Sequence, residues 1–339
     1  MASFLAQRLG QTVFVLFGVS VIVFGMIHAI PGDPVDIIFA GENVTAEQRE
    51  ALRQQLGLDR GLPIQYMDFV TNAAQGDLGI SVRRQVPVSA MLAATLPATL
   101  ELLLAALLFA IVIAVPVAVV AGLRPGTAWD RVGSAGALFG IALPSFWLGI
   151  MLMLIFAVGL GWLPSTGRIA TGMQVPQITG FIVIDAVLQG RWDAVGSALR
   201  HLILPAVTSG VAIAATIARV LRSGILEVRG QDHIDALQAR GVAFFRVVRH
   251  ILRNALPATV TVMGVRIGTL LGGQIVVETV FSWPGLGRLI VDAIRARDFP
   301  TVQGAVLVMA LLFVVINLIT DFLYAWLDPR VRYGQREAV

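Results

Sequence analysis

The segment from Gln231 to Pro257 reads QDHIDALQARGVAFFRVVRHILRNALP and separates two long apolar runs. It carries four arginines, and Gly241 divides it into two stretches whose spacing predicts two short amphipathic helices. An ordered, basic, helical segment beside apolar runs is typical of a surface that contacts a partner. The nature of that partner therefore decides the function.

The composition places the chain in a membrane. Of its 339 residues 57% are hydrophobic and only 14% are charged, which is too apolar for a soluble protein of this length. The chain has no cysteine, which excludes disulfides, thiolate metal sites and thiol nucleophiles. All 25 basic residues are arginine. A phosphate-binding P-loop needs a lysine, so the chain has no such loop.

Six apolar runs are long enough to cross a bilayer, which takes roughly 20 helical residues each. They lie at residues 9–30, 97–123, 133–160, 202–222, 256–281 and 304–326. The first run is longer than the apolar core of a signal peptide and no small-x-small cleavage site follows it, so we interpret it as a retained span. We therefore expect an all-α integral membrane protein with six transmembrane helices.

Arginines predict the orientation of these spans. The short segments 1–8, 124–132 and 223–255 and the tail after Trp326 are dense in arginine, which is typical of the cytoplasmic side. We expect the protein to cross the membrane several times and both termini to be cytoplasmic. The basic charge is better explained by this topology than by nucleic acid binding.

The two long outer segments carry structure of their own. In the segment 31–96, Thr45 and Gln48 have the spacing of a capping box and predict a helix that ends at Gly57. The segment 161–201 begins with a turn at residues 163–167, and a short amphipathic piece follows at residues 184–192.

Four ionisable residues lie within or at the ends of the predicted spans: Glu101, Arg266, Glu278 and Asp321. A charge in hydrocarbon costs about 2.5–3.5 kcal/mol on insertion scales, so each is expected to face protein or water. Two interpretations stay open. These groups either line a translocation path and contact the solute, or they pair with a neighbouring span and stabilise the bundle.

Trp283 and Pro284 follow the fifth run at its outer end. They either shape the outer mouth of a path or simply anchor the chain at the interface and end a helix. The histidines are scattered and have no metal-binding spacing, and no nucleophile with a base is visible, so neither a metal site nor an enzyme is predicted.

Asp235, Ala236, Leu237 and Gly241 resemble the "EAA" loop of inner-membrane permeases of binding-protein-dependent ABC importers, with Asp235 in place of the Glu and Leu237 in place of the second Ala. Further resemblances to the dipeptide/oligopeptide branch of this family follow in order along the chain. They are residues 30–34 (IPGDP), 56–59 (LGLD), 76–79 (GDLG), 143–147 (LPSFW), 201–205 (HLILP), 249–250 (RH), 252–257 (LRNALP), 278–287 (ETVFSWPGLG) and 328–330 (DPR).

The resemblance implies a type I ABC importer permease fold with a cytoplasmic coupling helix, located in the bacterial inner membrane. It implies an N-terminal helix and periplasmic loop at 1–95, a permease core at 96–327 with its coupling loop at 223–255, and a cytoplasmic tail at 328–339. The residues expected to contact and couple to an ATPase are Asp235, Ala236, Leu237, Gly241 and Arg246.

The implied partners are a second permease subunit, two ATP-binding subunits, a solute-binding protein, the peptide or related solute, and membrane lipid. The chain needs no cofactor, because ATP is used by the partner subunits. Nickel, glutathione and opine-like compounds are alternative solutes of this branch. An ion-coupled secondary transporter is the alternative from another class, and anionic lipid headgroups are the alternative contact of the arginine-rich loop.

Overall fold

A computed structural model describes residues 2–29, 45–55 and 59–327 of the chain; within these ranges it leaves undescribed the side chains of residues 2–9, 27–29, 49, 51, 52, 55, 265, 321 and 323–327. Regular structure in the described residues is helical, and their one isolated bridge joins Ile80 to Pro87. The prediction of an all-α protein is confirmed. The chain forms two compact units, Met1–Pro97 with Pro284–Val314 and Ala98–Trp283 with Val315–Val339, which we describe separately.

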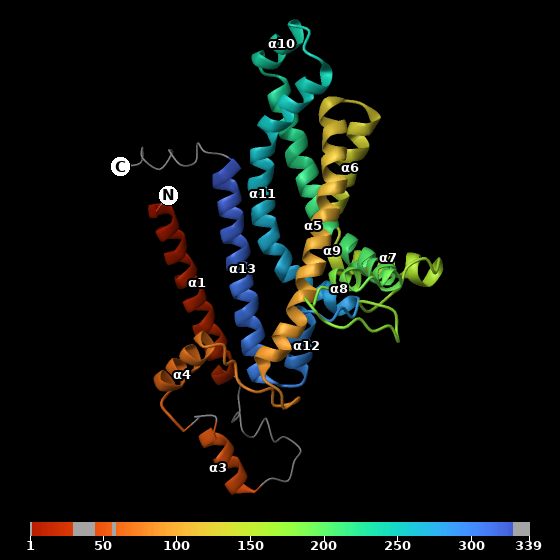
Figure 1. The fold of residues 1–339 in the computed structure, drawn as a ribbon. Helices are drawn as coiled ribbons and strands as arrows, with labels where there is room; N and C mark the ends of the chain where they lie inside the picture. Colours follow the sequence, from red (N-terminus) through yellow and green to blue (C-terminus); the bar gives the residue numbers. More distant parts are fainter. Residues whose placement is uncertain (1, 30–44, 56–58, 328–339) are drawn as a thin grey trace. The chain divides into compact units, whose positions relative to one another are not determined.

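The first unit contains α1 (Ala2–Ala29), α3 (Ala46–Gln55), α4 (Leu62–Ala74), the first turns of α5 (Val88–Leu123), α12 (Leu286–Arg295) and the larger part of α13 (Phe299–Leu327) (Figure 1). Its core is an apolar cluster of residues from α5, α12 and α13, namely Val88, Met91, Leu92, Leu286, Leu289, Ile290 and Ala305. Buried Asp298 accepts hydrogen bonds from the hydroxyls of Ser81 (2.5 Å) and Thr301 (2.8 Å), which fixes the segment before α5 to the start of α13.

The predicted capping box is confirmed at the start of α3. The Gln48 amide N–H donates to Thr45 Oγ1 (3.3 Å), and the Thr45 amide N–H donates to Gln48 Oε1 (3.0 Å). This reciprocal pair satisfies two donors at the helix start. The predicted stop at Gly57 lies outside the described residues, as do the motifs at residues 30–34 and 328–330.

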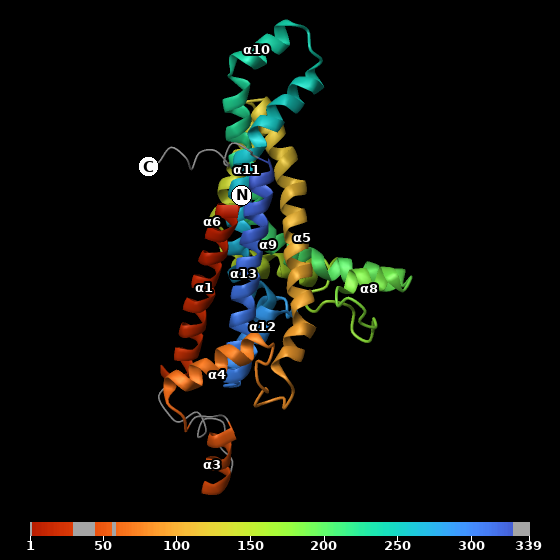
Figure 2. The same cartoon turned by 60° about the vertical axis from the view of Figure 1, so that its left-hand side comes forward.

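The second unit contains the rest of α5, then α6 (Ala128–Ala142), α7 (Ser145–Leu152), the π-helix η1 (Met153–Gly159), α8 (Ile182–Leu188), α9 (Trp192–Arg229), α10 (Asp232–Ala239) and α11 (Phe244–Val280). Helix α9 contacts α6, α7, α8 and α11 and is the centre of this unit. Figures 1 and 2 show α10 at one end of the unit, beyond the adjoining ends of α9 and α11, and α7 and α8 toward the other end.

Three helical stretches are long and apolar enough to cross a membrane, Val88–Leu123, Trp192–Arg229 and Phe299–Thr320, and two bent helix pairs raise this number to five among the described residues. The first predicted span corresponds to a shorter apolar stretch, Gly10–Met26. Each predicted run thus coincides with a helix or a bent pair, and the described residues support three to five spans of the six predicted.

The predicted span at 133–160 corresponds to a bent pair of helices and not to one continuous helix. The chain bends by 107° between Ala128–Ala142 and Ser145–Gly159. Leu143 is extended (ψ 125°), because a residue before proline avoids the helical region. Pro144 then caps the new helix, which begins at Ser145.

The expectation of a second short helix after Gly241 is wrong. Residues 244–255 form the first turns of α11, which continues to Val280. No glycine or proline interrupts residues 244–256, and Pro257 is accommodated inside the helix, as prolines often are in transmembrane helices. The segment that begins at Phe244 is therefore a helical extension of a predicted span.

Gly210 on α9 provides a test of this packing. A Cβ at Gly210 would lie 2.7 Å from the Ala106 carbonyl oxygen and 2.7 Å from the Phe109 ring, whereas a Cβ at Gly196 on the same helix would meet nothing within 4 Å. We expect Gly210→Ala to destabilise the protein by about 1–3 kcal/mol through overpacking. Gly196→Ala should be neutral or stabilising because alanine is the better helix former. Equal thermal midpoints of the two variants in detergent would contradict this packing.

Candidate functional site

The first candidate site is the α10 hairpin, which we define as residues 230–246. Asp232 and Asp235 lie in the first turn of α10, where a negative charge is favourable next to the positive end of the helix dipole. At the other end, the Val242 N–H donates to the Leu237 carbonyl (3.1 Å) and the Gly241 N–H to the Gln238 carbonyl (2.9 Å). These two bonds form a Schellman motif, and Gly241 has the positive φ (71°) that the motif requires.

Burial divides α10 into an anchored and an open side. Ile234 is fully buried, and α10 contacts α11, on which Val247 and Ile251 are also buried. Asp235 and Ala236 are exposed. The hairpin is therefore held by an apolar anchor and presents its polar and small residues outward.

All five residues predicted to couple to a partner lie on this hairpin. Leu237 is half-buried, whereas Gly241 and Arg246 are exposed like Asp235 and Ala236. Sequence reasoning missed Phe244 and Phe245, which are 72% and 86% exposed at the start of α11. Two adjacent aromatic residues in a polar loop were the available signal, since exposed aromatic side chains of this size are typical of contact surfaces.

The base of the hairpin is tied to two neighbouring helices. Arg222 on α9 donates from Nε to Asp130 Oδ1 (2.5 Å) and from Nη2 to Asp130 Oδ2 (3.0 Å), near the start of α6. Arg229, at the end of α9, donates to the Leu123 carbonyl (2.9 Å) at the end of α5. The Gly126 amide N–H (2.9 Å) and the Ser134 hydroxyl (3.4 Å) also donate to the Asp130 carboxylate. A displacement of α9 would therefore also move the ends of α5 and α6.

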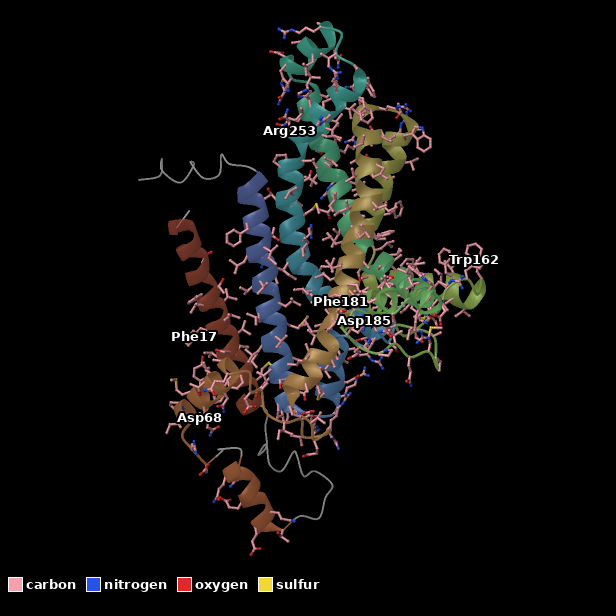
Figure 3. The ribbon with its side chains drawn as sticks, in the orientation of Figure 1. Phe17, Asp68, Trp162, Phe181, Asp185 and Arg253 are labelled. Carbon is pink, nitrogen blue, oxygen red and sulfur yellow. The ribbon has the colours of Figure 1, made fainter. Side chains whose placement is uncertain are left out.

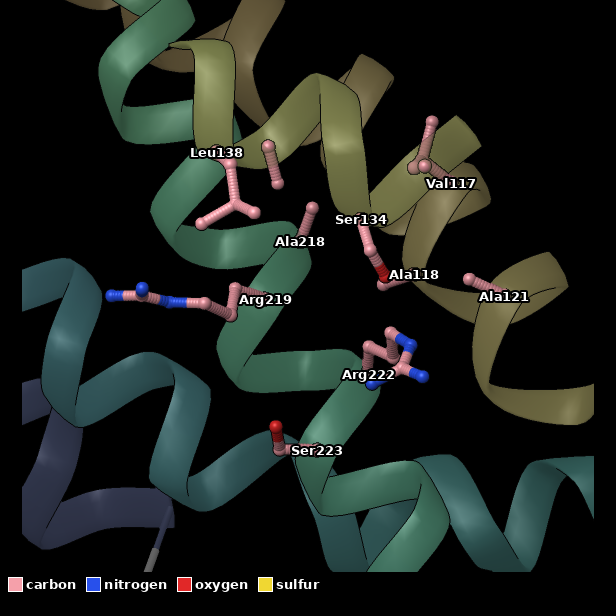
Figure 4. Close-up of a pocket in the computed structure, with 11 residues that line it drawn as sticks. Val117, Ala118, Ala121, Ser134, Leu138, Ala218, Arg219, Arg222 and Ser223 are labelled. Carbon is pink, nitrogen blue, oxygen red and sulfur yellow. The ribbon is translucent and has the colours of Figure 1, made fainter. Parts of the chain in front are cut away.

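A cavity of about 290 Å³ lies beside this connection, between α5, α6 and α9 (Figure 4). Its walls are mostly small, including Ala118, Ala121 and Gly133. In Figure 4 Arg222 is turned toward α5 and α6, while Arg219 points away from them. Because the guanidinium of Arg222 already holds Asp130, this cavity offers little to a polar solute.

Arg266, a predicted path residue, is exposed on α11 directly after a 41° bend between Phe244–Gly264 and Arg266–Val280. It lines a second cavity, of about 220 Å³, together with residues of α6, α7 and α9. Glu278 lies in different surroundings, because it is fully buried and accepts a hydrogen bond from Thr99 Oγ1 (2.7 Å). The side chain of Asp321 is outside the described part of the chain.

Glu101, another predicted path residue, forms a buried ion pair. The Arg168 Nε and Nη2 donate to Glu101 Oε2 (2.8 and 2.5 Å), and the Val183 amide N–H donates to Oε1 (3.0 Å). Arg168 also donates to the Gly180 carbonyl (2.8 Å). Glu101 thus fixes the segment 168–183 to α5, which fits a structural role. Sequence reasoning could not find Arg168, because its partner lies 67 positions away.

Trp283 belongs to the same end of the second unit. Its ring is fully buried and its Nε1–H donates to the Ala98 carbonyl (2.8 Å), with the Arg168 guanidinium 5.9 Å from the ring centroid. The interpretation of this side chain as an interfacial anchor therefore does not apply, and any effect of Trp283 on an outer mouth is indirect. Pro284, which follows, is exposed.

The segment before α8 is shaped by Asp185. Burial raises the pKa of this carboxyl group, but hydrogen bonds from the Thr179 hydroxyl and from the amides of Thr179, Ile178 and Gly180 lower it by more, so its pKa lies below the ordinary value. Figure 3 places Asp185 and Trp162 toward one end of the second unit and Arg253 toward the other. Among the described residues, no group of three His, Asp or Glu side chains could hold a metal ion.

The Arg168–Glu101 pair can be tested against an exposed pair. Both of its side chains are 10% exposed or less, whereas those of Arg60 and Asp68 are 56% and 50% exposed. We expect Arg168→Gln to destabilise the protein by about 3–5 kcal/mol because it leaves a buried carboxylate unpaired, and Arg60→Gln to have little effect. Thermal midpoints and hydrogen exchange at the Val183 amide measure the difference. Similar values for the two variants would remove the proposed structural role of Glu101.

Comparison with known proteins places this geometry in a family. The family described as "Binding-protein-dependent transport system inner membrane component" matches residues 114–333, and the corresponding N-terminal family matches residues 1–105. A chain of the MetNI methionine ABC transporter, in an inward-facing conformation, has a TM-score of 0.53 at 21% identity and covers 70% of this chain and 96% of its own length. This likeness concerns the fold, and it supports the predicted permease fold.

Curated relatives are similar over nearly the whole length. The di/tripeptide transport system permease protein DppB of Pseudomonas aeruginosa (strain UCBPP-PA14) is 41% identical over 98% of this chain and 99% of its own. The dipeptide permease DppB of Escherichia coli (strain K12) is 39% identical, over 98% and 99%. The glutathione permease GsiC of Escherichia coli (strain K12) is 38% identical, over 98% and 100%. The chain therefore belongs to the family of binding-protein-dependent transport system inner membrane components, the permease subunits of ABC importers.

Proposed function

We propose that this chain is a permease subunit of an ATP-driven importer of dipeptides, oligopeptides or related solutes, and that it forms half of the translocation pathway. The observation that carries the proposal is the similarity to DppB and GsiC permeases along almost the entire chain. The solutes in these names are all peptides, glutathione included. A peptide-like solute is therefore the class we assign.

The energy for transport comes from other subunits. The chain has no lysine and hence no P-loop, so it has no means of its own to bind ATP in that way. We assign to it as partners a second permease subunit, two ATP-binding subunits and a solute-binding protein. The chain itself carries out no chemical reaction and needs no cofactor.

The α10 hairpin is the proposed docking element for an ATP-binding subunit. Its exposed groups are small or polar, as at Asp235, Ala236 and Gly241, with Phe244 and Phe245 beside them as apolar anchors. The buried Ile234 and the Schellman turn hold α10 as one piece, so a push on it is passed to α9 and α11. The bonds from Arg222 and Arg229 then pass the movement to α6 and α5.

This role implies an orientation. The α10 hairpin and both termini lie in the cytoplasm, and the segments 31–96 and 161–201 lie outside the inner membrane. The high density of arginine around α10 supports this placement, because cytoplasmic loops of membrane proteins are rich in basic residues. The Glu101–Arg168 pair and the buried Trp283 then lie toward the outer side of the second unit.

The function is tested by reconstituting the complete transporter in vesicles. We expect uptake of a dipeptide to require ATP and the binding protein together, because the permease has no P-loop of its own and depends on the ATP-binding subunits for energy. Omitting either should reduce uptake to the background of empty vesicles. Uptake driven by a proton or sodium gradient in the absence of ATP would instead support a secondary transporter and refute the proposal.

Coupling is tested at Gly241 with Gly172 as a matched control. Both glycines have a positive φ (71° and 84°), and an added Cβ would meet nothing within 4 Å at either one. Valine at such a backbone costs about 1–2 kcal/mol locally. We expect Gly241→Val to distort the end of α10 and to lower the number of solutes imported per ATP hydrolysed.

Gly172→Val introduces the same kind of strain far from α10 in the sequence and should leave this ratio unchanged. The measurement is ATP hydrolysis and uptake in the same vesicles. If both variants transport with an unaltered ratio, Gly241 has no part in coupling.

A further inference from the structure

The cavity around Arg266 combines one cationic group with hydroxyl groups and an apolar wall. It lies between α6, α7, α9 and α11, all in the second unit, and has a volume of about 220 Å³. Its polar groups come from Arg266, Ser145, Ser209, Thr216 and Thr269, and Ile213 and Leu270 are among its apolar ones. Among the described residues, no ion pair engages the Arg266 guanidinium, which makes it the charged donor of this cavity.

Three of the four hydroxyl groups that line this cavity already donate their protons within the protein. Thr216 donates to the Ala212 carbonyl (2.9 Å) and Thr269 donates to the Arg266 carbonyl (2.9 Å), each within its own helix. Ser209 donates to Gln274 Oε1 (3.2 Å). A hydroxyl whose proton is committed still has free lone pairs, so these three groups are acceptors toward a ligand.

A buried amide behind Ser209 is incompletely satisfied. Gln274 is 1% exposed, and its Nε2 is the one buried side-chain nitrogen or oxygen without a hydrogen-bond partner in the described residues. Leaving a buried donor unpaired costs about 1–3 kcal/mol, so such a group in a native protein points to a missing partner. It lies on α11 two turns from Arg266 and is linked to the cavity through Ser209.

The size of the cavity limits what it can hold. Whole ligands of drug size occupy pockets of roughly 300–1,000 Å³, so a cavity of about 220 Å³ accommodates one end of a solute. The guanidinium fork of Arg266 matches a carboxylate, with which arginine forms paired hydrogen bonds. The hydroxyl oxygens require a neighbouring N–H donor, and the apolar wall accommodates a side chain.

We propose that this cavity is a transit subsite for the C-terminal residue of a peptide, with Arg266 on the terminal carboxylate and the Ser209, Thr216 and Thr269 oxygens accepting from its amide N–H. The proposal rests on the proposed function and specifies the solute end that the permease itself recognises. A lipid phosphate fits less well. It would satisfy Arg266 but brings no N–H donor for the three hydroxyl oxygens.

The first experiment measures the charge of the cavity without transport. Because the chain has no cysteine, Thr269→Cys in the complete transporter introduces a single thiol into this chain. We compare its modification rate by anionic sulfonatoethyl and cationic trimethylammonioethyl methanethiosulfonate. Replacing Arg266 by Gln should lower the anion-to-cation ratio by about tenfold, because a nearby positive charge is lost. Arg200→Gln, at an exposed arginine near the start of α9, should not change it. An unchanged ratio with Arg266→Gln overturns the proposal.

The second experiment measures uptake of a dipeptide and of its C-terminal amide, each supplied on saturated binding protein. Arg266→Gln should slow the free acid by about tenfold and the amide by less than about twofold, since only the acid has the carboxylate that pairs with arginine. Arg266→Lys keeps the positive charge but lacks the planar guanidinium fork, so it should slow uptake of the free acid by a factor between these two values. It also replaces Arg266→Gln in the experiment if that variant does not assemble.

Equal slowing of acid and amide would make Arg266 a structural residue and overturn the proposal, as would a wild-type rate for both. These outcomes differ from a failure of the proposed function. In that case the wild-type transporter imports neither compound with ATP and binding protein present. A lipid occupant would be revealed by a modification ratio that rises when the transporter is placed in vesicles without anionic lipid, and this too would overturn the assignment.

Discussion

The ion pair between Arg222 and Asp130 is the contact on which the proposed mechanism depends. It joins two residues that lie 92 positions apart through two guanidinium-to-carboxylate hydrogen bonds, of 2.5 and 3.0 Å. A paired arginine–carboxylate contact resists rotation as well as separation, because two parallel bonds must break together. Together with the bond from Arg229 to the Leu123 carbonyl, it makes the ends of α5, α6 and α9 one mechanical base for the α10 hairpin. Without these bonds, a push on α10 would pass to α5 and α6 only through side-chain packing, and no charged contact would fix their ends to α9.

The opposite end of the second unit is held by a different kind of contact. There the Glu101–Arg168 pair is buried beside Trp283, and the hydrogen bonds to Val183 and Gly180 satisfy the remaining polar atoms. A buried charge is tolerated only when it is paired and hydrogen-bonded in this way. The three ionisable groups of the apolar runs whose side chains the structure describes therefore differ in their surroundings. Glu101 fits a structural role, Glu278 is buried with Thr99 as a partner, and Arg266 borders a cavity.

Several features were readable from local patterns because their physical causes are local. The capping box of α3 needs only Thr45 and Gln48 three residues apart, and the turn after α10 needs only a glycine at a positive φ. The differences between expectation and structure also have identifiable reasons. Leu143 and Pro144 bend a run whose hydropathy is uninterrupted, so an apolar average does not reveal the break. The second helix of the hairpin merged with α11 because nothing in residues 244–256 ends a helix, while polarity alone suggested a separate element.

The amino-acid sequence by itself determined that this chain is a helical membrane protein without a P-loop, that an ordered basic hairpin follows Gly230, and that its order of motifs resembles one family of permeases. Hydrophobicity, the absence of lysine and short-range spacing are properties of the chain and need no fold to be read. Only the tertiary structure decided that Arg222 meets Asp130, that Glu101 meets Arg168, and that Arg266 and Ser209 share a cavity. These partners come from helices far apart in the chain, and which of them meet depends on how small residues such as Gly210 let the helices pack.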